Sequence, residues 1–182
     1  MNIGFIGAGK VRTAFADIEK AVKDLNNTVF SIEGDEERIE VLEKILKTTG
    51  NRFFNISSNE KIIYHATACV LSNYFVTLMD YGLSLFEAIG IDSKERYKAM
   101  YPLIEGTMKN IYELGTEKAL MGPIARGDVN TIGKHIESIG SIVPDKLDFY
   151  KQIGYMTLSL AKRNKLDSSE KIKELQNILR GE

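Results

Sequence analysis

The sequence contains little cysteine and little proline, and both shortages narrow the class of protein. Cys69 is the one cysteine among 182 residues, which excludes an intrachain disulfide and a cluster of thiolates around zinc. A single thiol is typical of a reducing compartment, so we expect a cytoplasmic protein. The three prolines form no Pro-rich linker, and the sequence has no internal repeat or low-complexity tract. With 43% hydrophobic and 27% charged residues, the composition is that of an ordinary globular chain.

An excess of charge of one sign is also lacking. The 24 Lys and Arg residues nearly balance the 25 Asp and Glu residues, and like charges do not gather in runs of five or six. The chain therefore offers no concentration of positive charge that would bind nucleic acid or an anionic membrane surface, and we expect neither as a partner. The first residues lack the basic region of a secretory signal, and Lys10 interrupts their apolar run.

One long run without charge is present, at residues 62–79 (IIYHATACVLSNYFVTLM). Its length approaches that of a membrane-spanning helix. His65, Ser72 and Asn73 lie inside it, so we predict a helix that is buried in protein on most sides.

Strands are expected only near the start of the chain. Short aromatic or β-branched runs bounded by turn residues predict strands at 2–6, 28–33 and 52–56. Apolar residues at helical spacing predict a helix at about 36–48, with Asp35 as its N-cap.

After residue 57 the sequence is helical throughout. Ser57 and Glu60 have the spacing of a capping box at the start of a helix that continues to Gly90. Further helices are expected at about 92–114 with a kink at Pro102, 116–121, 128–139, 144–164 and 168–180. The expected caps at the starts of three of these helices are Asp92, Asp128 and Asp167. The predicted domains are therefore an α/β segment at 1–57 and a helical domain at 58–182.

The opening residues, MNIGFIGAGKV (1–11), are typical of a dinucleotide-binding domain. Gly7 and Gly9 supply two glycines of the G-x-G-x-x-G turn, where the backbone approaches a pyrophosphate. The third position holds Arg12, and Glu33 is the last residue of the next predicted strand, roughly where a carboxylate meets a ribose hydroxyl. Two interpretations stay open: a working nucleotide site that begins with a βαβ unit, or a tight turn in a small α/β layer.

Several longer stretches resemble one family of Rossmann-like NAD(P)-dependent oxidoreductases, which carry a helical C-terminal domain of unknown function. The family is related to pyrroline-5-carboxylate reductase and to the 6-phosphogluconate dehydrogenase-like superfamily. The stretches are FSIEGDEE (30–37), YHATACVLSNY (64–74), PLIEGTMKNI (102–111) and MGPIARGD (121–128), and the opening 1–11 resembles the start of the same family.

The chain departs from that family in one place. Val11 is followed almost at once by a stretch that lies much later in the family, so most of the dinucleotide-binding domain is missing. The resemblance therefore implies a mainly α chain, in which a small α/β remnant of a Rossmann-like domain precedes an all-helical domain like the C-terminal domain of 6-phosphogluconate dehydrogenase. It also implies that Glu33 belongs to a strand leading out of the sheet. The implied cofactor is NADP or NAD on Gly7 and Gly9, and the implied assembly is a homodimer.

The predicted long helix carries a stripe of candidate site residues. Lys61, His65, Cys69 and Ser72 follow one another at helical spacing, with Asn73 at the edge of the stripe. A neutral imidazole acts as an acid or base near pH 7, and an amide beside it orients a substrate carboxylate. The alternative is that His65 is a hydrogen-bonded core residue. We interpret Cys69 as core filling, since no cation is expected beside it.

The stretch 121–128 is the loop richest in turn residues. Gly122 permits unusual backbone angles, and Arg126 presents a planar fork suited to a carboxylate or phosphate. The alternative is that Arg126 pairs with Asp128 and only stabilises the turn. His135 shows no ligand pattern, and we expect no metal site.

Three functions remain open on the sequence. The first is that of the family, an NAD(P)-dependent oxidoreductase of a small anionic substrate, in which His65 and Asn73 are catalytic while Lys61, Gly122 and Arg126 bind substrate. The second is a non-catalytic, dimeric helical binding module that has lost its cofactor domain. The third is a miniature nucleotide binder that uses Gly7 and Glu33. The few predicted strands argue against a complete cofactor site in this chain.

Overall fold

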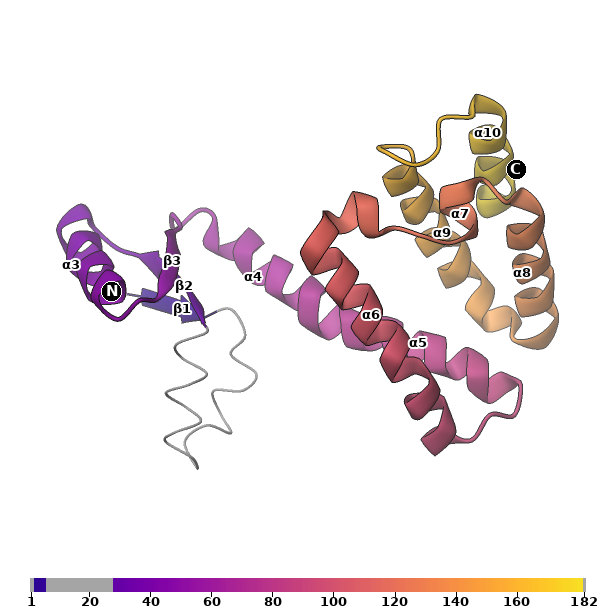
Figure 1. Ribbon diagram of the computed structural model, residues 1–182, viewed down its shortest axis with the longest axis horizontal. Helices are drawn as coiled ribbons and strands as arrows, with labels where there is room; N and C mark the ends of the chain where they lie inside the picture. The colour runs from indigo at the N-terminus through magenta and orange to yellow at the C-terminus, as the bar shows by residue number, and fades with distance from the viewer. Residues whose placement is uncertain (1, 6–27, 182) are drawn as a thin grey trace. The chain divides into compact units, whose positions relative to one another are not determined.

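The computed structural model describes residues 2–5 and 28–181. The chain divides into two compact units, Met1–Thr77 and Leu78–Glu182. Most described residues are helical, and the strands are confined to the first unit (Figure 1). The predicted fold class, mainly α with a small α/β segment before an all-helical part, is confirmed.

The first unit contains a three-stranded sheet in the order β1-β2-β3. The strands β1 (Asn2–Phe5), β2 (Val29–Glu33) and β3 (Arg52–Asn55) lie where the sequence predicts them. Helix α3 (Glu36–Thr48) connects β2 to β3, which pair in parallel. By contrast, β1 and β2 pair antiparallel. The interpretation of the opening as a βαβ unit is therefore wrong, because such a unit joins parallel strands.

The core of the first unit lies between α3 and the sheet. Buried Phe30 and Ile32 of β2 pack with Leu42 and Leu46 of α3. The alternating strand positions and the helical spacing in α3 place these apolar side chains on facing surfaces. The N-cap is the predicted Asp35, whose side chain accepts a hydrogen bond from the Arg38 amide at 3.2 Å.

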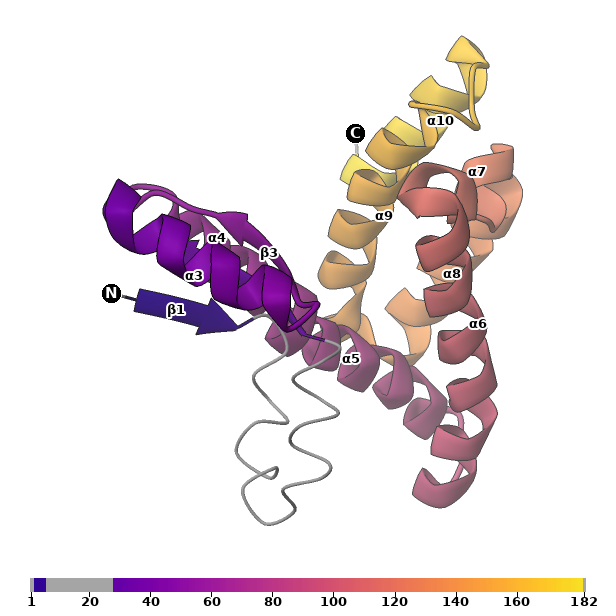
Figure 2. The same cartoon turned by 60° about the vertical axis from the view of Figure 1, so that its left-hand side comes forward.

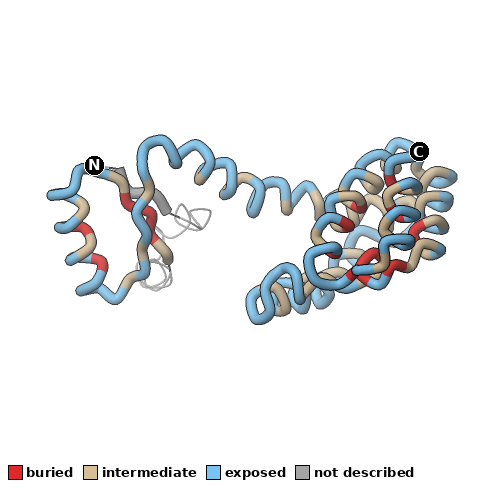
Figure 3. The backbone as a smooth tube through the Cα atoms, turned by 90° about the horizontal axis from the view of Figure 1, so that it is seen from above, coloured by how far each residue is buried: buried red, intermediate tan, exposed pale blue. Residues whose placement is uncertain are grey.

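A long helix follows β3. It consists of α4 (Lys61–Cys69), a π-helical turn η2 (Val70–Tyr74) and α5 (Phe75–Ala88). The predicted burial of its uncharged run is wrong for the single chain, since Ile62 is 82% and Leu71 is 74% exposed. Figure 3 draws α4 almost entirely as exposed or intermediate tube. By length and composition alone, Lys61–Ala88 is apolar enough to cross a membrane.

Helix α6 (Ser93–Ala119) begins the all-helical part of the second unit after α5. Asp92 is its N-cap, as predicted, and accepts a hydrogen bond from the Lys94 amide at 2.9 Å. The backbone continues through Pro102 but leaves helical angles at Gly115, where φ is 76°. The glycine rather than the proline therefore interrupts α6, because positive φ is open to glycine at little cost.

The remaining helices form a small bundle. They are α7 (Pro123–Arg126), α8 (Val129–Ile142), a 3-10 turn η3 (Pro144–Lys146), α9 (Leu147–Ala161) and α10 (Ser169–Arg180). Their shared core contains Ile124, Ile132, Leu158, Leu175 and Leu179. Figure 2 shows α8 beside α9, and α10 contacts both of these helices. The N-cap of α10 is Ser168, not the predicted Asp167.

Candidate functional site

The predicted substrate residue Lys61 is held in an ion pair at the start of α4. Its Nζ lies 2.8 Å from Oε2 of Glu33, the last residue of β2. Ser58 donates its hydroxyl to the other carboxylate oxygen, Oε1, at 2.6 Å. Both oxygens of Glu33 are therefore engaged within the protein, which favours the interpretation of Glu33 as part of the strand over a ribose-binding role.

His65 lies on the exposed surface of α4, one turn after Lys61. Its Nε2 is 3.6 Å from the Sγ of Cys69, which is half-buried. In the single chain His65 is thus no core residue, and its imidazole is open to a ligand.

The π turn η2 contains Asn73 and was not expected from the sequence. A π turn closes its hydrogen bond one residue later than an α turn, so the residues that follow are turned back by about 100°. Asn73 lies inside this turn, so its position along the helix differs from the one that an uninterrupted α-helix would give it. Such single π turns within helices recur at functional sites.

The stretch 121–128 is partly structural. Its centre forms the single turn α7, in which Ile124 is buried in the bundle core. Gly127 has a φ of 68°, and a Cβ added there would lie 2.7 Å from Cδ of Lys171. Only glycine fits this position, because of both the backbone angle and the close neighbour.

Arg126 is exposed, and it makes no hydrogen bond or ion pair with any residue that the structure describes. The alternative pairing with Asp128 is not formed. Asp128 instead accepts hydrogen bonds from the Thr131 hydroxyl at 2.7 Å and the Thr131 amide at 3.0 Å. These two bonds, more than the charge of Arg126, lower the pKa of Asp128. The Arg126 guanidinium thus remains available to an anion.

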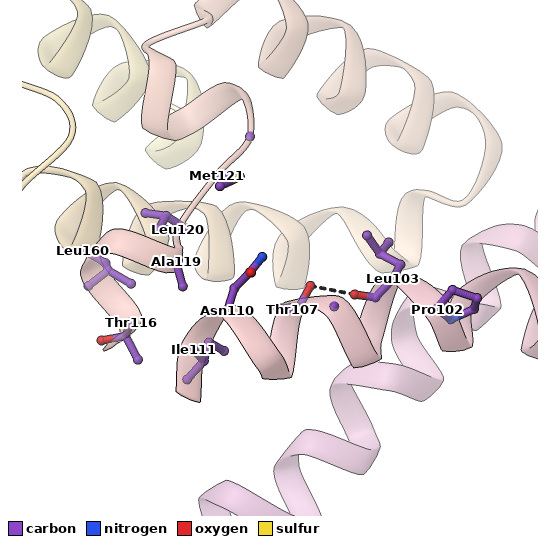
Figure 4. A pocket seen from close by; sticks show the side chains of 12 residues that line it. Pro102, Leu103, Thr107, Asn110, Ile111, Thr116, Ala119, Leu120, Met121 and Leu160 are labelled. Atoms are coloured by element: carbon purple, nitrogen blue, oxygen red, sulfur yellow. Dashed lines mark hydrogen bonds between the residues drawn. The ribbon is translucent and has the colours of Figure 1, made fainter. Parts of the chain in front are cut away.

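The predicted substrate residue Gly122 lines an open groove of about 600 Å³ in the second unit. Figure 4 shows this groove between α6 and the segment leading into α7, with the Asn110 side chain pointing from α6 toward Leu120 and Met121. The lining residues are uncharged and mostly apolar: Pro102, Leu103, Gly106, Thr107, Asn110, Ile111, Thr116, Ala119, Leu120, Met121, Gly122 and Leu160. Its volume lies in the range of ligand pockets, roughly 300–1,000 Å³.

The stretch 102–111 forms one wall of the groove, although no site residue was predicted in it. Leu103, Gly106, Thr107 and Asn110 are spaced at i, i+3, i+4 and i+7, which places them on one helix face. The sequence could have indicated this wall of the groove, because a glycine and two small polar side chains fall on the same helix face.

The predicted site residues are distributed over both compact units. Lys61, His65 and Asn73 belong to the first unit, whereas Gly122 and Arg126 belong to the second. Gly7 and Gly9, the predicted cofactor contacts, lie outside the described residues. Within the part of the chain that the structure describes, no three His, Cys, Asp or Glu side chains gather around a possible metal position.

The described part of the sheet does not fit a dinucleotide. A Gly-rich turn holds a pyrophosphate where a parallel strand leads into a helix and on to its neighbour. Here β1 and β2 are antiparallel, and Glu33 is occupied by Ser58 and Lys61. We therefore derive no step through a nicotinamide cofactor.

Comparison with known proteins places most of the chain in one family. Residues 28–157 match the sequence model described as "Domain of unknown function (DUF2520)". The crystal structure of protein TM1727 from Thermotoga maritima is similar, with a TM-score of 0.72 and 26% sequence identity. The similarity covers 88% of this chain but only 61% of the Thermotoga chain. The comparison with curated proteins found no match.

Proposed function

Because the chain belongs to the DUF2520 family, we propose that it contributes the substrate-binding part of an NAD(P)-dependent oxidoreductase that acts on a small anionic substrate. We further propose that this chain lacks a complete cofactor site of its own. The oxidoreductase activity is the one that the family resemblance implies. The lack of a complete cofactor site is inferred from the antiparallel pairing of β1 with β2.

A contrast between the two units supports the proposal. The helical unit offers a groove of ligand size whose walls come from 102–111 and 121–122, two of the stretches that resemble the oxidoreductase family. The sheet, by contrast, offers no parallel crossover from β1 to β2. We expect this combination in a protein that has kept its substrate-binding helical domain but lacks most of its dinucleotide-binding domain.

The proposed roles follow from the chemistry of the side chains. His65 is the acid or base near neutral pH, and Asn73 orients the substrate by hydrogen bonds. Arg126 binds the substrate anion through charge-assisted hydrogen bonds, and Gly122 lets the substrate approach the backbone. Lys61 is the further substrate-binding residue. Its ion pair with Glu33 already neutralises part of the charge that its ammonium would offer to an anion.

Titration with NADPH and NADH, followed by nicotinamide fluorescence, tests the absence of a complete cofactor site. We expect no saturable binding up to millimolar cofactor, because the described strands lack the parallel crossover. Micromolar binding that is lost in Gly9→Asp but kept in Asn164→Asp would contradict this part of the proposal. Asn164 is exposed in the second unit, so its variant adds the same charge away from the glycine turn.

Binding of succinate and inorganic phosphate tests the substrate side. We expect amide NMR shifts in residues 122–128 that saturate, with binding at least about tenfold weaker in Arg126→Ala, since a hydrogen bond to a charged group contributes about 1.5–3 kcal/mol. Arg163→Ala, which removes another exposed arginine, is the matched control. Equal binding by both variants would count against an anion site at Arg126.

The second candidate is a non-catalytic, dimeric helical binding module. It is favoured by one observation, the exposed apolar side chains along the uncharged run 62–79. This function predicts self-association without saturable binding of nicotinamide, succinate or phosphate.

A further inference from the structure

Lys171 lies against the stretch 121–128 and provides a second cation beside Arg126. It belongs to the first turn of α10, and its Cδ would lie 2.7 Å from a Cβ added at Gly127, the residue that follows Arg126. The same added Cβ would lie 3.3 Å from Cβ of Lys171 and 2.9 Å from Cδ1 of Leu166. The aliphatic part of Lys171 therefore packs on the buried Gly127, and Lys171 and Arg126 are neighbours on the surface of the second unit.

The charges of Arg126 and Lys171 are not neutralised by contact with the described part of the chain. Both side chains are exposed, and among the described residues neither has a partner in an ion pair or a side-chain hydrogen bond. Asp128 uses both of its carboxylate oxygens to cap α8. Asp167 and Glu170 are exposed and form no ion pair with either cation. Two positive charges therefore remain available side by side.

We propose that Arg126 and Lys171 together bind the phosphate group of a phosphate monoester, so that the small anionic substrate is a phosphorylated molecule. The inference rests on the proposed function, because it identifies more closely the anion that Arg126 binds there. Lys171 is then a further substrate-binding residue, and the number of cations at the site determines which class of anion is preferred.

A phosphate group uses both cations better than a carboxylate does. A carboxylate carries one charge and two oxygens in a plane, and the planar guanidinium of Arg126 engages both oxygens by parallel hydrogen bonds. A phosphate monoester carries a charge of about −1.5 to −2 near pH 7 and has three strong acceptor oxygens. One phosphate group can therefore accept hydrogen bonds from the Arg126 guanidinium and, at its remaining oxygen, from the Lys171 ammonium.

The packing of Lys171 favours this role. A free lysine side chain has many rotamers, and a ligand that orders all of them binds more weakly. The contacts with Gly127 and Leu166 already order the aliphatic part of Lys171, so only the bonds beyond Cδ remain to be fixed. Gly127 permits these contacts, because any larger residue at this position would meet the Lys171 side chain.

The test compares two anions that carry the same methyl group, methyl phosphate and acetate. Both are titrated into the full chain at constant ionic strength and about pH 8, above the second phosphate pKa of about 6. Backbone amide NMR shifts of residues 122–128 report binding. We expect methyl phosphate to bind at least about tenfold more tightly than acetate, because it engages both cations.

Lys171→Met removes the ammonium but keeps an unbranched side chain to pack on Gly127. We expect it to raise the dissociation constant of methyl phosphate at least about fivefold and that of acetate less than about twofold. Lys171→Arg restores a positive charge and should recover most of the affinity for methyl phosphate. The matched control is Lys173→Met, because Lys173 is exposed on the same helix and lies about 200° around its axis from Lys171. We expect this control to leave the affinity for both anions unchanged.

Three results would overturn the inference: equal affinity for methyl phosphate and acetate, equal effects of the two methionine variants, or inorganic phosphate that binds more tightly than methyl phosphate, which would assign the site to the free ion. In each of these cases, acetate binding that is lost in Arg126→Ala would still support the anion site of the proposed function. Absence of binding by all three anions would contradict both the inference and that anion site.

Discussion

At the scale of single residues, two helix-interior glycines have opposite environments. Gly154 is buried in α9, where an added Cβ would lie 2.7 Å from Cδ2 of Leu179. Gly133 lies inside α8, and an added Cβ there meets nothing within 4 Å. Replacement by alanine therefore measures mainly the effect of core packing at Gly154 and the effect of helix propensity at Gly133.

We expect Gly154→Ala to lower the free energy of unfolding by about 1–3 kcal/mol, because the extra methyl group overpacks the bundle core. Gly133→Ala, its matched control, should raise the free energy of unfolding by about 0.5–1 kcal/mol through helix propensity alone. Urea denaturation of both variants measures the difference. A neutral Gly154→Ala would mean that Leu179 moves aside at no cost.

At the scale of elements, the start of α8 depends on one carboxylate. The hydrogen bonds from Thr131 lower the pKa of Asp128 below its ordinary value of 3.8. A carboxyl whose pKa is lower in the folded state stabilises the fold above the unfolded pKa, and the stabilisation is lost as the pH falls through the folded pKa.

We therefore expect Asp128→Ala to lower the urea midpoint at pH 7, and the difference from wild type to shrink as the pH falls below about 4. Glu137→Ala removes an exposed carboxylate from the middle of the same helix and should leave the midpoint nearly unchanged. Urea titrations at several pH values provide the measurement. A deficit in Asp128→Ala that stays constant into acid would argue against the cap as its cause.

At the scale of the whole molecule, the described residues form two separate cores. One contains Phe30, Ile32, Leu42 and Leu46, and the other surrounds Leu158 in the helical bundle. Leu158 is 1% exposed, so its truncation leaves a cavity in the second core.

We expect Leu158→Ala to destabilise the helical bundle by about 2–5 kcal/mol while leaving the sheet protected. Native-state hydrogen exchange measures the stability of both cores in one experiment. We expect the amides of α9 and α10 to exchange faster in the variant and those of β2 to exchange at the wild-type rate. Faster exchange in β2 as well would mean that the two units unfold together.

Local signals in the sequence predicted the elements well. Asp35, Asp92 and Asp128 each cap the helix that was assigned to them, and the three strands lie at their expected positions. These features depend on residues a few positions apart, which a sequence displays directly. The predicted domain boundary near residue 57 coincides with the end of the strands but stays a prediction.

The site was predicted less completely, for a physical reason. The antiparallel direction of β1 and the groove around Asn110 depend on which distant segments meet. The exposure of the helix 62–77 likewise depends on what the rest of the chain leaves uncovered.

The sequence was enough to predict the helices, most of their caps, the mainly α class and the uncharged run at 62–79. The folded chain was needed to show that β1 opposes β2, that Arg126 has no partner among the described residues, and that 102–111 faces Met121 across a groove. Capping and periodicity are set by contacts within a few residues, whereas strand direction, exposure and cavity shape follow from contacts between segments far apart along the chain.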